Sequence, residues 1–241
     1  MFESKKNSIE FKVWGRYALF TDPLTKLGGE KCSYHIPTYE ALKGIAKSIY
    51  WKPTFTWFID EVRVLNRIRT QTKGTKPLEF GGGNSLAYYT FLADVAYQVR
   101  AHFEWNPYRP ELAEDRIDNK HFEIAKRALS KGGRQDIFLG TRDCQGYVEP
   151  CVFGQGEGAY DQAGELAYGL MFHGFDYPDE TGVHQMVARF WQPVLRDGYL
   201  RFEPPAQCRV RKEIKEMKPK QFKLDQSCQP STALLGEMEG K

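Results

Sequence analysis

Lys120 and His121 are the adjacent residues with the clearest potential for chemistry, because they stand at the start of a predicted helix. Backbone N–H groups point outward from the first turn of a helix, and the macrodipole adds partial positive charge there. A phosphate is therefore favoured at this end, and the Lys120 ammonium adds a full charge. The same field disfavours a protonated His121 and keeps its imidazole available for proton transfer. The pair suits phosphodiester chemistry, although spacing alone leaves open that both are solvated first-turn residues.

Tyr50 is a third candidate, at the end of the first predicted helix. Its phenol can donate a hydrogen bond to a reacting oxygen or accept one from it. The alternative is an amphipathic residue whose ring packs beside Trp51 and whose hydroxyl lies in water.

Signatures of other catalytic classes are missing from the sequence. The run Gly81–Asn84 has neither the GK[ST] of a P-loop nor the GxGxxG of a dinucleotide site. Gly154–Gly158 has a GxGxG form in acidic surroundings, which favours a turn over a phosphate site. The histidines lack HExxH spacing and the cysteines lack CxxC spacing, so we expect neither a metal nor a cofactor.

Composition and charge limit the class of protein. The 241 residues, 41% of them hydrophobic, can bury a sizeable core, and no run reaches the roughly 20 apolar residues of a membrane helix. Without a recognisable secretory signal, we expect a cytoplasmic protein with no membrane partner. Residues 1–142 hold 23 basic and 16 acidic residues, whereas 143–188 hold eight acids and no Lys or Arg. The first part therefore attracts a polyanion, and we expect the acidic stretch to meet a basic protein subunit or to face solvent.

Hydrophobic periodicity predicts strands and helices in the order βαββαβ. The predicted elements are a strand over 9–19, a helix capped by Thr38 that runs to about Tyr50, strands over 55–65 and 95–105, a helix capped by Asp118 or Asn119 that ends at Gly132–Gly133, and a strand within 136–153. A long irregular segment separates the second and third strands. We predict an α+β protein: an N-terminal ferredoxin-like (RRM-like) domain over 1–153, then a smaller, mainly antiparallel β domain over 154–224. Residues 225–241 are expected to form a loosely held tail.

Several motifs spread along the chain resemble those of one family. They are Phe11–Gly15, Phe20–Pro23, Pro37–Ile45, Ile49–Pro53, Glu79–Asn84, Asp136–Gly140 with Asp143–Cys144, and His173–Pro178. Together they resemble the smaller members of the repeat-associated RNA-binding (RAMP) superfamily of CRISPR-associated proteins, in the type I-C (Dvulg) branch. The resemblance runs from about Phe11 to Lys220.

This resemblance implies a metal-independent, sequence- and structure-specific endoribonuclease. It would cut the CRISPR precursor RNA at the base of the repeat hairpin and stay on the guide RNA with the other subunits of the type I-C surveillance complex. The matching catalytic positions are Tyr50, Lys120 and His121. Lys120 would stabilise charge, His121 would transfer a proton, and Tyr50 would position or protonate an oxygen. Attack by the neighbouring 2′-hydroxyl would leave a 2′,3′-cyclic phosphate and a 5′-hydroxyl. The sequence has Asp143 where the family often has Glu, and we attach no catalytic meaning to that difference.

Basic side chains and a glycine turn are candidates for holding the RNA. The predicted contacts are Lys43, Lys47, Arg100, His102, Lys126, Gly132, Gly133 and Arg134. Arg100 and His102 alternate with apolar residues in the 95–105 strand, a pattern typical of a sheet with one face open to water or ligand. Two alternatives stay open: a scaffold that grips the guide handle without cutting it, and a protein that also binds DNA.

Overall fold

The computed structural model describes residues 6–25 and 29–220. The predicted tail over 225–241 lies outside these residues. No helix in the described ranges is long and apolar enough to cross a membrane.

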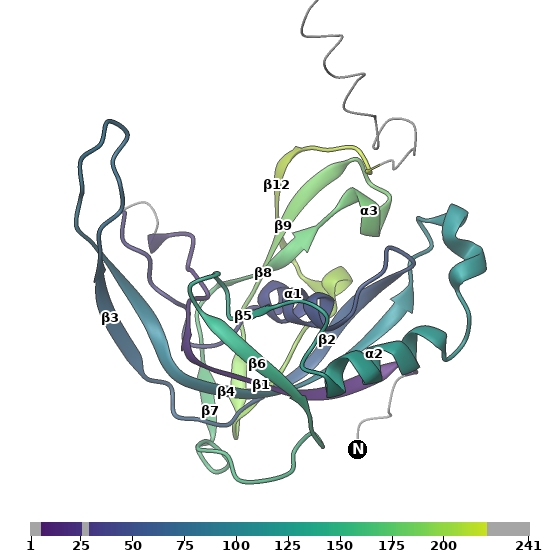
Figure 1. Cartoon of the computed structure of the whole chain (residues 1–241), viewed down its shortest axis with the longest axis horizontal. Coiled ribbons are helices and arrows are strands. Elements are labelled where there is room, and N and C mark those ends of the chain that lie inside the picture. The colour runs from purple at the N-terminus through teal and green to yellow at the C-terminus, as the bar shows by residue number, and fades with distance from the viewer. Residues whose placement is uncertain (1–5, 26–28, 221–241) are drawn as a thin grey trace, which may run out of the picture.

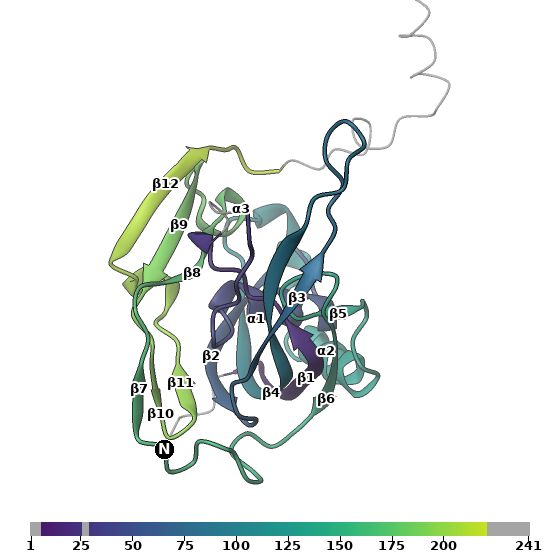
Figure 2. The ribbon, with the colours of Figure 1, turned by 90° about the vertical axis from the view of Figure 1, so that its left-hand side faces the viewer.

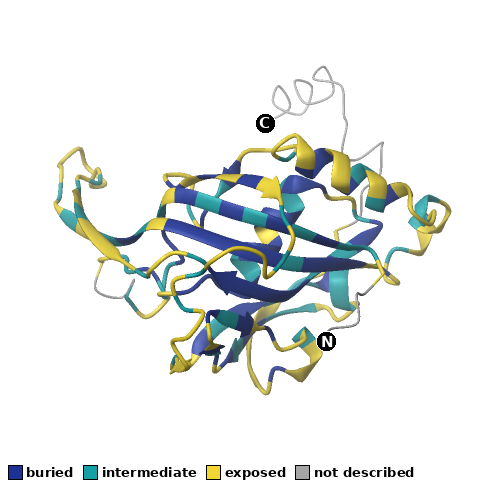
Figure 3. Ribbon diagram, turned by 90° about the horizontal axis from the view of Figure 1, so that it is seen from below, coloured by how far each residue is buried: buried dark blue, intermediate teal, exposed yellow. Residues whose placement is uncertain are grey.

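The centre of the molecule is an antiparallel sheet with the strand order β6-β1-β4-β2 (Figure 1). Its strands are β1 (Ser8–Ala18), β2 (Phe55–Val64), β4 (Ala87–Trp105) and β6 (Gln145–Pro150), and β5 (Ile137–Phe138) pairs with β6 at the edge. Alternation in β1 places Phe11 and Val13 in the core, where both are completely buried. Burial along the central strands and exposure of the hairpin beyond them are visible in Figure 3.

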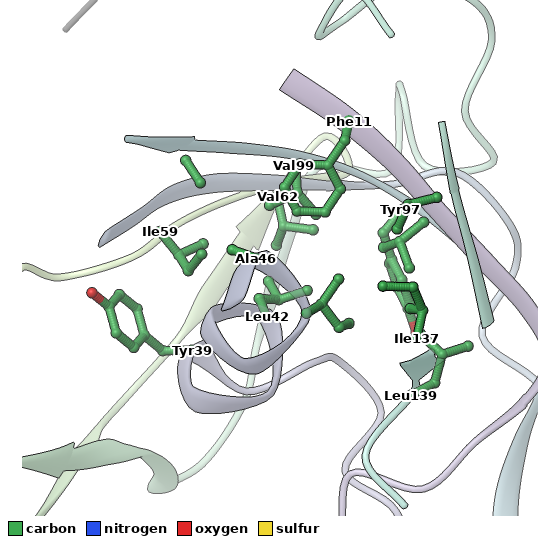
Figure 4. Packing of buried hydrophobic residues seen from close by; sticks show 14 of the residues in the cluster. Phe11, Tyr39, Leu42, Ala46, Ile59, Val62, Tyr97, Val99, Ile137 and Leu139 are labelled. Carbon is green, nitrogen blue, oxygen red and sulfur yellow. The ribbon is translucent and has the colours of Figure 1, made fainter. Parts of the chain in front are cut away.

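Two helices of eleven residues each belong to this sheet: α1 (Tyr39–Ile49) and α2 (Lys120–Ser130). The predicted cap of α1 is confirmed, because the Thr38 hydroxyl accepts a hydrogen bond from the Ala41 N–H at 3.2 Å. Leu42 and Ala46 on the inner face of α1 are completely buried, and Figure 4 shows them among core residues of the sheet.

A hairpin replaces the irregular segment predicted after residue 65. Strand β3 (Thr70–Thr75) pairs with the first part of β4, which makes β4 19 residues long, and the hairpin projects from the molecule (Figures 1 and 2). In this first part of β4, apolar and polar residues do not alternate clearly, because most of the side chains there are not buried on either face of the strand.

The C-terminal half supplies strands to two sheets. β7 (Glu165–Ala167), β10 (Val194–Arg196) and β11 (Tyr199–Arg201) extend the central sheet, because β11 pairs with β2. β8 (Met171–Asp176), β9 (Gln185–Trp191) and β12 (Val210–Glu216) form a second antiparallel sheet, with the short helix α3 (Pro178–Thr181) between β8 and β9. Short 3-10 segments cover Pro110–Asp115, with a kink at Leu112, and Pro205–Gln207. Strands on both sides of residue 154 thus share one sheet, and a division into domains at that residue stays a prediction.

The structure has the mixed α and β character predicted from the sequence, with mostly antiparallel strands and few helices.

Candidate active site

The packing of α1 near α2 brings Tyr50 and His121 into direct contact. The Tyr50 hydroxyl lies 2.8 Å from His121 Nδ1, and the two rings are stacked with their centroids 5.9 Å apart. Tyr50 is held in place because its N–H donates to the Ala46 carbonyl and its own carbonyl accepts from Trp57 Nε1 at 2.7 Å. Two predicted catalytic residues that are far apart in the sequence therefore form one hydrogen-bonded unit.

His121 is buried, with 1% of its surface exposed, between the rings of Phe55 and Trp105. Its Nε2 faces two oxygens of Asp115: the backbone carbonyl at 2.8 Å and the carboxylate Oδ2 at 3.2 Å. Because both oxygens are acceptors, Nε2 carries the ring proton. In the neutral ring, Nδ1 is then the acceptor, and Tyr50 donates to it.

Lys120 joins this unit through Asp115. Its ammonium lies 2.6 Å from Asp115 Oδ1, and its side chain is 41% exposed. Thr54 Oγ1 donates to the other carboxylate oxygen at 2.8 Å. Hydrogen bonds from Lys120 and Thr54 hold the pKa of Asp115 below its ordinary value, so Asp115 is a carboxylate at neutral pH.

Burial raises the pKa of Tyr50, and the Asp115 carboxylate raises it further, against the opposing effect of Arg134. Tyr50 is therefore a protonated phenol at neutral pH and can donate to His121. The Arg134 guanidinium carbon lies 5.6 Å from the centre of the Tyr50 ring.

The start of α2 differs in detail from the prediction. Asn119 occupies the N-cap position with a left-handed backbone (φ 62°), and its side chain makes no capping hydrogen bond. The predicted end is confirmed: Gly132 and Gly133 both have positive φ, 84° and 101°. The Arg134 N–H then bonds to the Ser48 and Ile49 carbonyls, each at 3.1 Å, which places this exposed arginine beside Tyr50.

The other predicted RNA contacts are mostly engaged within the protein. Lys43 is buried on Glu180, and Lys47 lies 3.0 Å from the same carboxylate. His102 is 3% exposed and lies 2.8 Å from Asp60. Contacts of Lys43, Lys47 and His102 with RNA stay predictions.

The prediction of an open polar face on the 95–105 strand is wrong for Gln98 and Arg100, because the segment after β6 covers both side chains. Gln98 exchanges two hydrogen bonds with the backbone of this segment, from Gly154 N–H at 2.9 Å and to the Gln155 carbonyl at 2.8 Å. Arg100 lies 2.9 Å from Glu10 and 4.3 Å from the centre of the Phe153 ring. The alternation of polar and apolar residues shows that Gln98 and Arg100 lie on the opposite face of the strand from the core. It cannot show that polar partners from another part of the chain cover that face. Contact of Arg100 with RNA stays a prediction.

Lys126 is exposed on α2, with its ammonium 3.7 Å from Glu123 and 5.2 Å from the Phe122 ring centre. The structure leaves it accessible, and its contact with RNA also stays a prediction.

Sequence reasoning missed Asp115 and Thr54. Asp115 falls in the segment predicted as a connection, and Thr54 directly precedes a predicted strand. The one signal in the sequence is an acid five residues before Lys120. That spacing does not by itself predict a contact, because the contact forms only when the segment Pro110–Asp115 folds back onto α2.

Sequence reasoning also missed three basic residues at the base of the β3–β4 hairpin, here called the hairpin-base cations: Arg16, Lys31 and Lys73. Lys73 Nζ lies 3.2 Å from the centre of the Tyr17 ring, with the Arg16 guanidinium carbon 5.3 Å from it, and Lys31 Nζ lies 4.8 Å from the Tyr89 ring centre. Over residues 6–25 and 29–220, none of the three forms an ion pair with a carboxylate. They come from three separate segments, so no local motif marks them.

Within the same ranges, no group of three or more His, Cys, Asp or Glu side chains is placed to hold a metal ion.

Comparisons with known proteins cover most of the chain. The family model Cas_Cas5d, described as CRISPR-associated protein (Cas_Cas5), matches residues 8–203. CRISPR pre-crRNA endoribonuclease Cas5d from Thermus thermophilus is 32% identical over 152 residues, which are 59% of this chain and 63% of that protein, so less than two thirds of this relative's length is matched. The protein of the same name from Mannheimia succiniciproducens is 27% identical over 229 residues, covering 82% of this chain and 96% of that one. A solved crystal structure of a CRISPR-associated protein is 33% identical, covers 88% of this chain and 100% of that one, and superposes with a TM-score of 0.74. The match of the family model over most of the chain shows that the protein belongs to the Cas5d family of CRISPR-associated proteins.

Proposed function

We propose that this chain is a metal-independent endoribonuclease that cuts CRISPR precursor RNA at the base of the repeat hairpin. Its relatives are named pre-crRNA endoribonucleases. The observation that carries the proposal is the 2.8 Å contact between Tyr50 and His121, with Lys120 held beside it through Asp115. These three residues supply the groups that metal-free cleavage of a phosphodiester requires: two that move protons and one cation.

The geometry favours a proton relay. The 2′-hydroxyl of the RNA loses its proton to the Tyr50 oxygen while Tyr50 passes its own proton to His121 Nδ1, and the 2′-oxygen attacks the adjacent phosphorus. The reverse transfer, from His121 through Tyr50, protonates the departing 5′-oxygen. The exposed Lys120 ammonium stabilises the negative charge that develops on the phosphate oxygens when the phosphorus becomes five-coordinate. The products are a 2′,3′-cyclic phosphate and a 5′-hydroxyl.

A non-catalytic scaffold is the second candidate, and one observation favours it. Tyr50 and His121 are each only 1% exposed, so a nucleotide reaches them only after the groups that cover them move. In a scaffold, Lys120 would bind a phosphate and the buried pair would only stabilise the packing of α1 and α2.

We further propose that β1, α1, β2, β4, α2 and β6 form a ferredoxin-like unit within residues 1–153. The antiparallel order β6-β1-β4-β2, with one helix between β1 and β2 and one between β4 and β6, supports it. Residues 154–224 would then form the second, mainly β, part of the chain.

The hairpin-base cations are the surface we propose for holding the RNA strand. In the part of the chain that the structure describes, these cations form no ion pair with a carboxylate and lie beside aromatic rings. Such cations attract phosphates, and aromatic rings let bases stack, which is the usual basis of single-strand binding. The product would stay bound as the guide RNA, in the cytoplasm, within the type I-C surveillance complex. Binding to DNA is part of the same proposal, because such a surface selects weakly between backbones.

A repeat hairpin with a 2′-deoxy nucleotide at the cut site tests the mechanism. In EDTA, the protein should cut the all-RNA hairpin once and leave a 2′,3′-cyclic phosphate, and it should bind the 2′-deoxy hairpin without cutting it. Cutting of the 2′-deoxy hairpin would refute attack by the 2′-oxygen. Binding of both hairpins without any cutting would favour the scaffold.

A further inference from the structure

Asp115 lies at the centre of the candidate site. It ends the turn Pro110–Asp115 and contacts Lys120, His121 and Thr54 at once. Its carboxylate binds Lys120 at 2.6 Å and Thr54 at 2.8 Å, and its backbone carbonyl binds His121 Nε2 at 2.8 Å. One residue thus contacts two of the three proposed catalytic residues. It holds His121 Nε2, the ring nitrogen that does not face Tyr50.

We propose that Asp115 is a positioning residue for RNA cleavage, an inference that rests on the proposed function. Its backbone carbonyl keeps the proton of His121 on Nε2, which leaves Nδ1 as the nitrogen that exchanges a proton with Tyr50. Its carboxylate keeps Lys120 beside the site until the RNA binds and neutralises the charge that His121 gains during the relay.

Charge supports this assignment. When Tyr50 passes its proton to Nδ1, an imidazolium forms 3.2 Å from Asp115 Oδ2. A carboxylate at that distance stabilises the charged ring, as the orienting acid of a serine protease triad does. Lys120 and Thr54 keep the pKa of Asp115 low in the free protein, so the carboxylate is ionised before the RNA binds.

The same carboxylate opposes RNA binding, and this separates a positioning role from a purely structural one. Asp115 Oδ1 occupies the Lys120 ammonium that must turn toward the phosphate, and its negative charge repels that phosphate. Removing the charge should therefore slow cleavage while RNA affinity is kept or increased. Loss of a purely structural residue would weaken both.

Asp115→Asn tests the proposal, because it keeps the shape of the side chain and removes its charge. Single-turnover cleavage of a labelled repeat hairpin in EDTA should slow about 10- to 100-fold, with an unchanged or smaller Kd. This loss is smaller than the roughly 10⁴-fold loss for the same change in a serine protease triad, because the backbone carbonyl still holds His121 Nε2. Asp118→Asn is the matched control: its carboxylate is 68% exposed and pairs with Lys6.

Thr54→Val is the second variant, and it tests the proposal if Asp115→Asn does not fold. It removes only the hydroxyl that holds Asp115 Oδ2, so cleavage should slow about 3- to 10-fold with an unchanged Kd. In the double variant the losses should not multiply, because both changes act on one carboxylate. A wild-type cleavage rate in folded Asp115→Asn, or in Thr54→Val when the first variant does not fold, overturns the proposal, as does an equal loss of RNA affinity. If the wild-type protein does not cut, the proposed function itself fails.

Discussion

Replacing Tyr50 by phenylalanine removes one buried hydroxyl and leaves His121 Nδ1 without its partner at 2.8 Å. A buried polar group left unpaired costs about 1–3 kcal/mol of folding free energy. For a domain of this size, a loss of about 2 kcal/mol lowers the melting temperature by about 4–8 °C. We therefore expect Tyr50→Phe to fold and to melt measurably earlier than the wild type.

The same change should have a larger effect on cleavage. A positioned proton donor or acceptor contributes about 10²- to 10⁴-fold to a rate, so cleavage should slow at least about 100-fold, or roughly 3 kcal/mol of transition-state stabilisation. RNA affinity should stay within about twofold of the wild type, because the lost hydroxyl is buried in the free protein.

The assay combines thermal unfolding, RNA binding and single-turnover cleavage of a labelled repeat hairpin in EDTA. Tyr147→Phe is the control, since this tyrosine is 55% exposed on β6. It should leave all three measurements unchanged. If Tyr50→Phe melts early and still cuts within about threefold of the wild-type rate, the hydroxyl is structural and the relay through Tyr50 is wrong.

Two further predictions concern RNA affinity and acid stability. Lys73→Ala combined with Lys31→Ala should weaken RNA binding and lower the salt dependence of log Kd by about one per lost phosphate contact, whereas Lys212→Ala on β12 should not; filter binding at several salt concentrations measures both. His173 is completely buried, and burial together with Arg189 lowers its pKa to about 3. The unfolded chain binds this proton below about pH 6.5 and the folded protein does not, so the associated stability is full above that pH, falls progressively below it, and is completely lost once the pH has fallen through about 3. The loss is about 2–3 kcal/mol at about pH 4.5, and urea unfolding should show a smaller loss in His173→Gln. If the variant lost as much folding free energy at acidic pH as the wild type, groups other than His173 would control the acid stability.

The sequence predicts best what depends on local patterns. The cap at Thr38, the buried face of α1 and the glycine stop after α2 each follow from neighbouring residues, and the structure has them as expected. The resemblance to the family also implies Tyr50 and His121 as catalytic positions, and the fold then brings these two residues into contact.

Features that depend on distant pairing could not be predicted in this way. Gln98 and Arg100 on the polar face of β4 are covered by residues 153–155, more than 50 positions along the chain, and β11 joins β2 across an even longer separation. Asp115 gains its contacts only when its turn packs against the start of α2. The hairpin-base cations likewise meet only because β1, β3 and the segment before α1 converge on β4.

Cleavage of a labelled CRISPR repeat hairpin in EDTA by the wild type and by His121→Ala is the most direct test of a metal-free ribonuclease built on His121. We expect the wild type to make one cut at the base of the hairpin, and the folded variant to bind the hairpin with similar affinity and leave it intact. A variant that cuts as fast as the wild type, or a wild type that cuts only when a metal ion is added, would contradict the proposed chemistry.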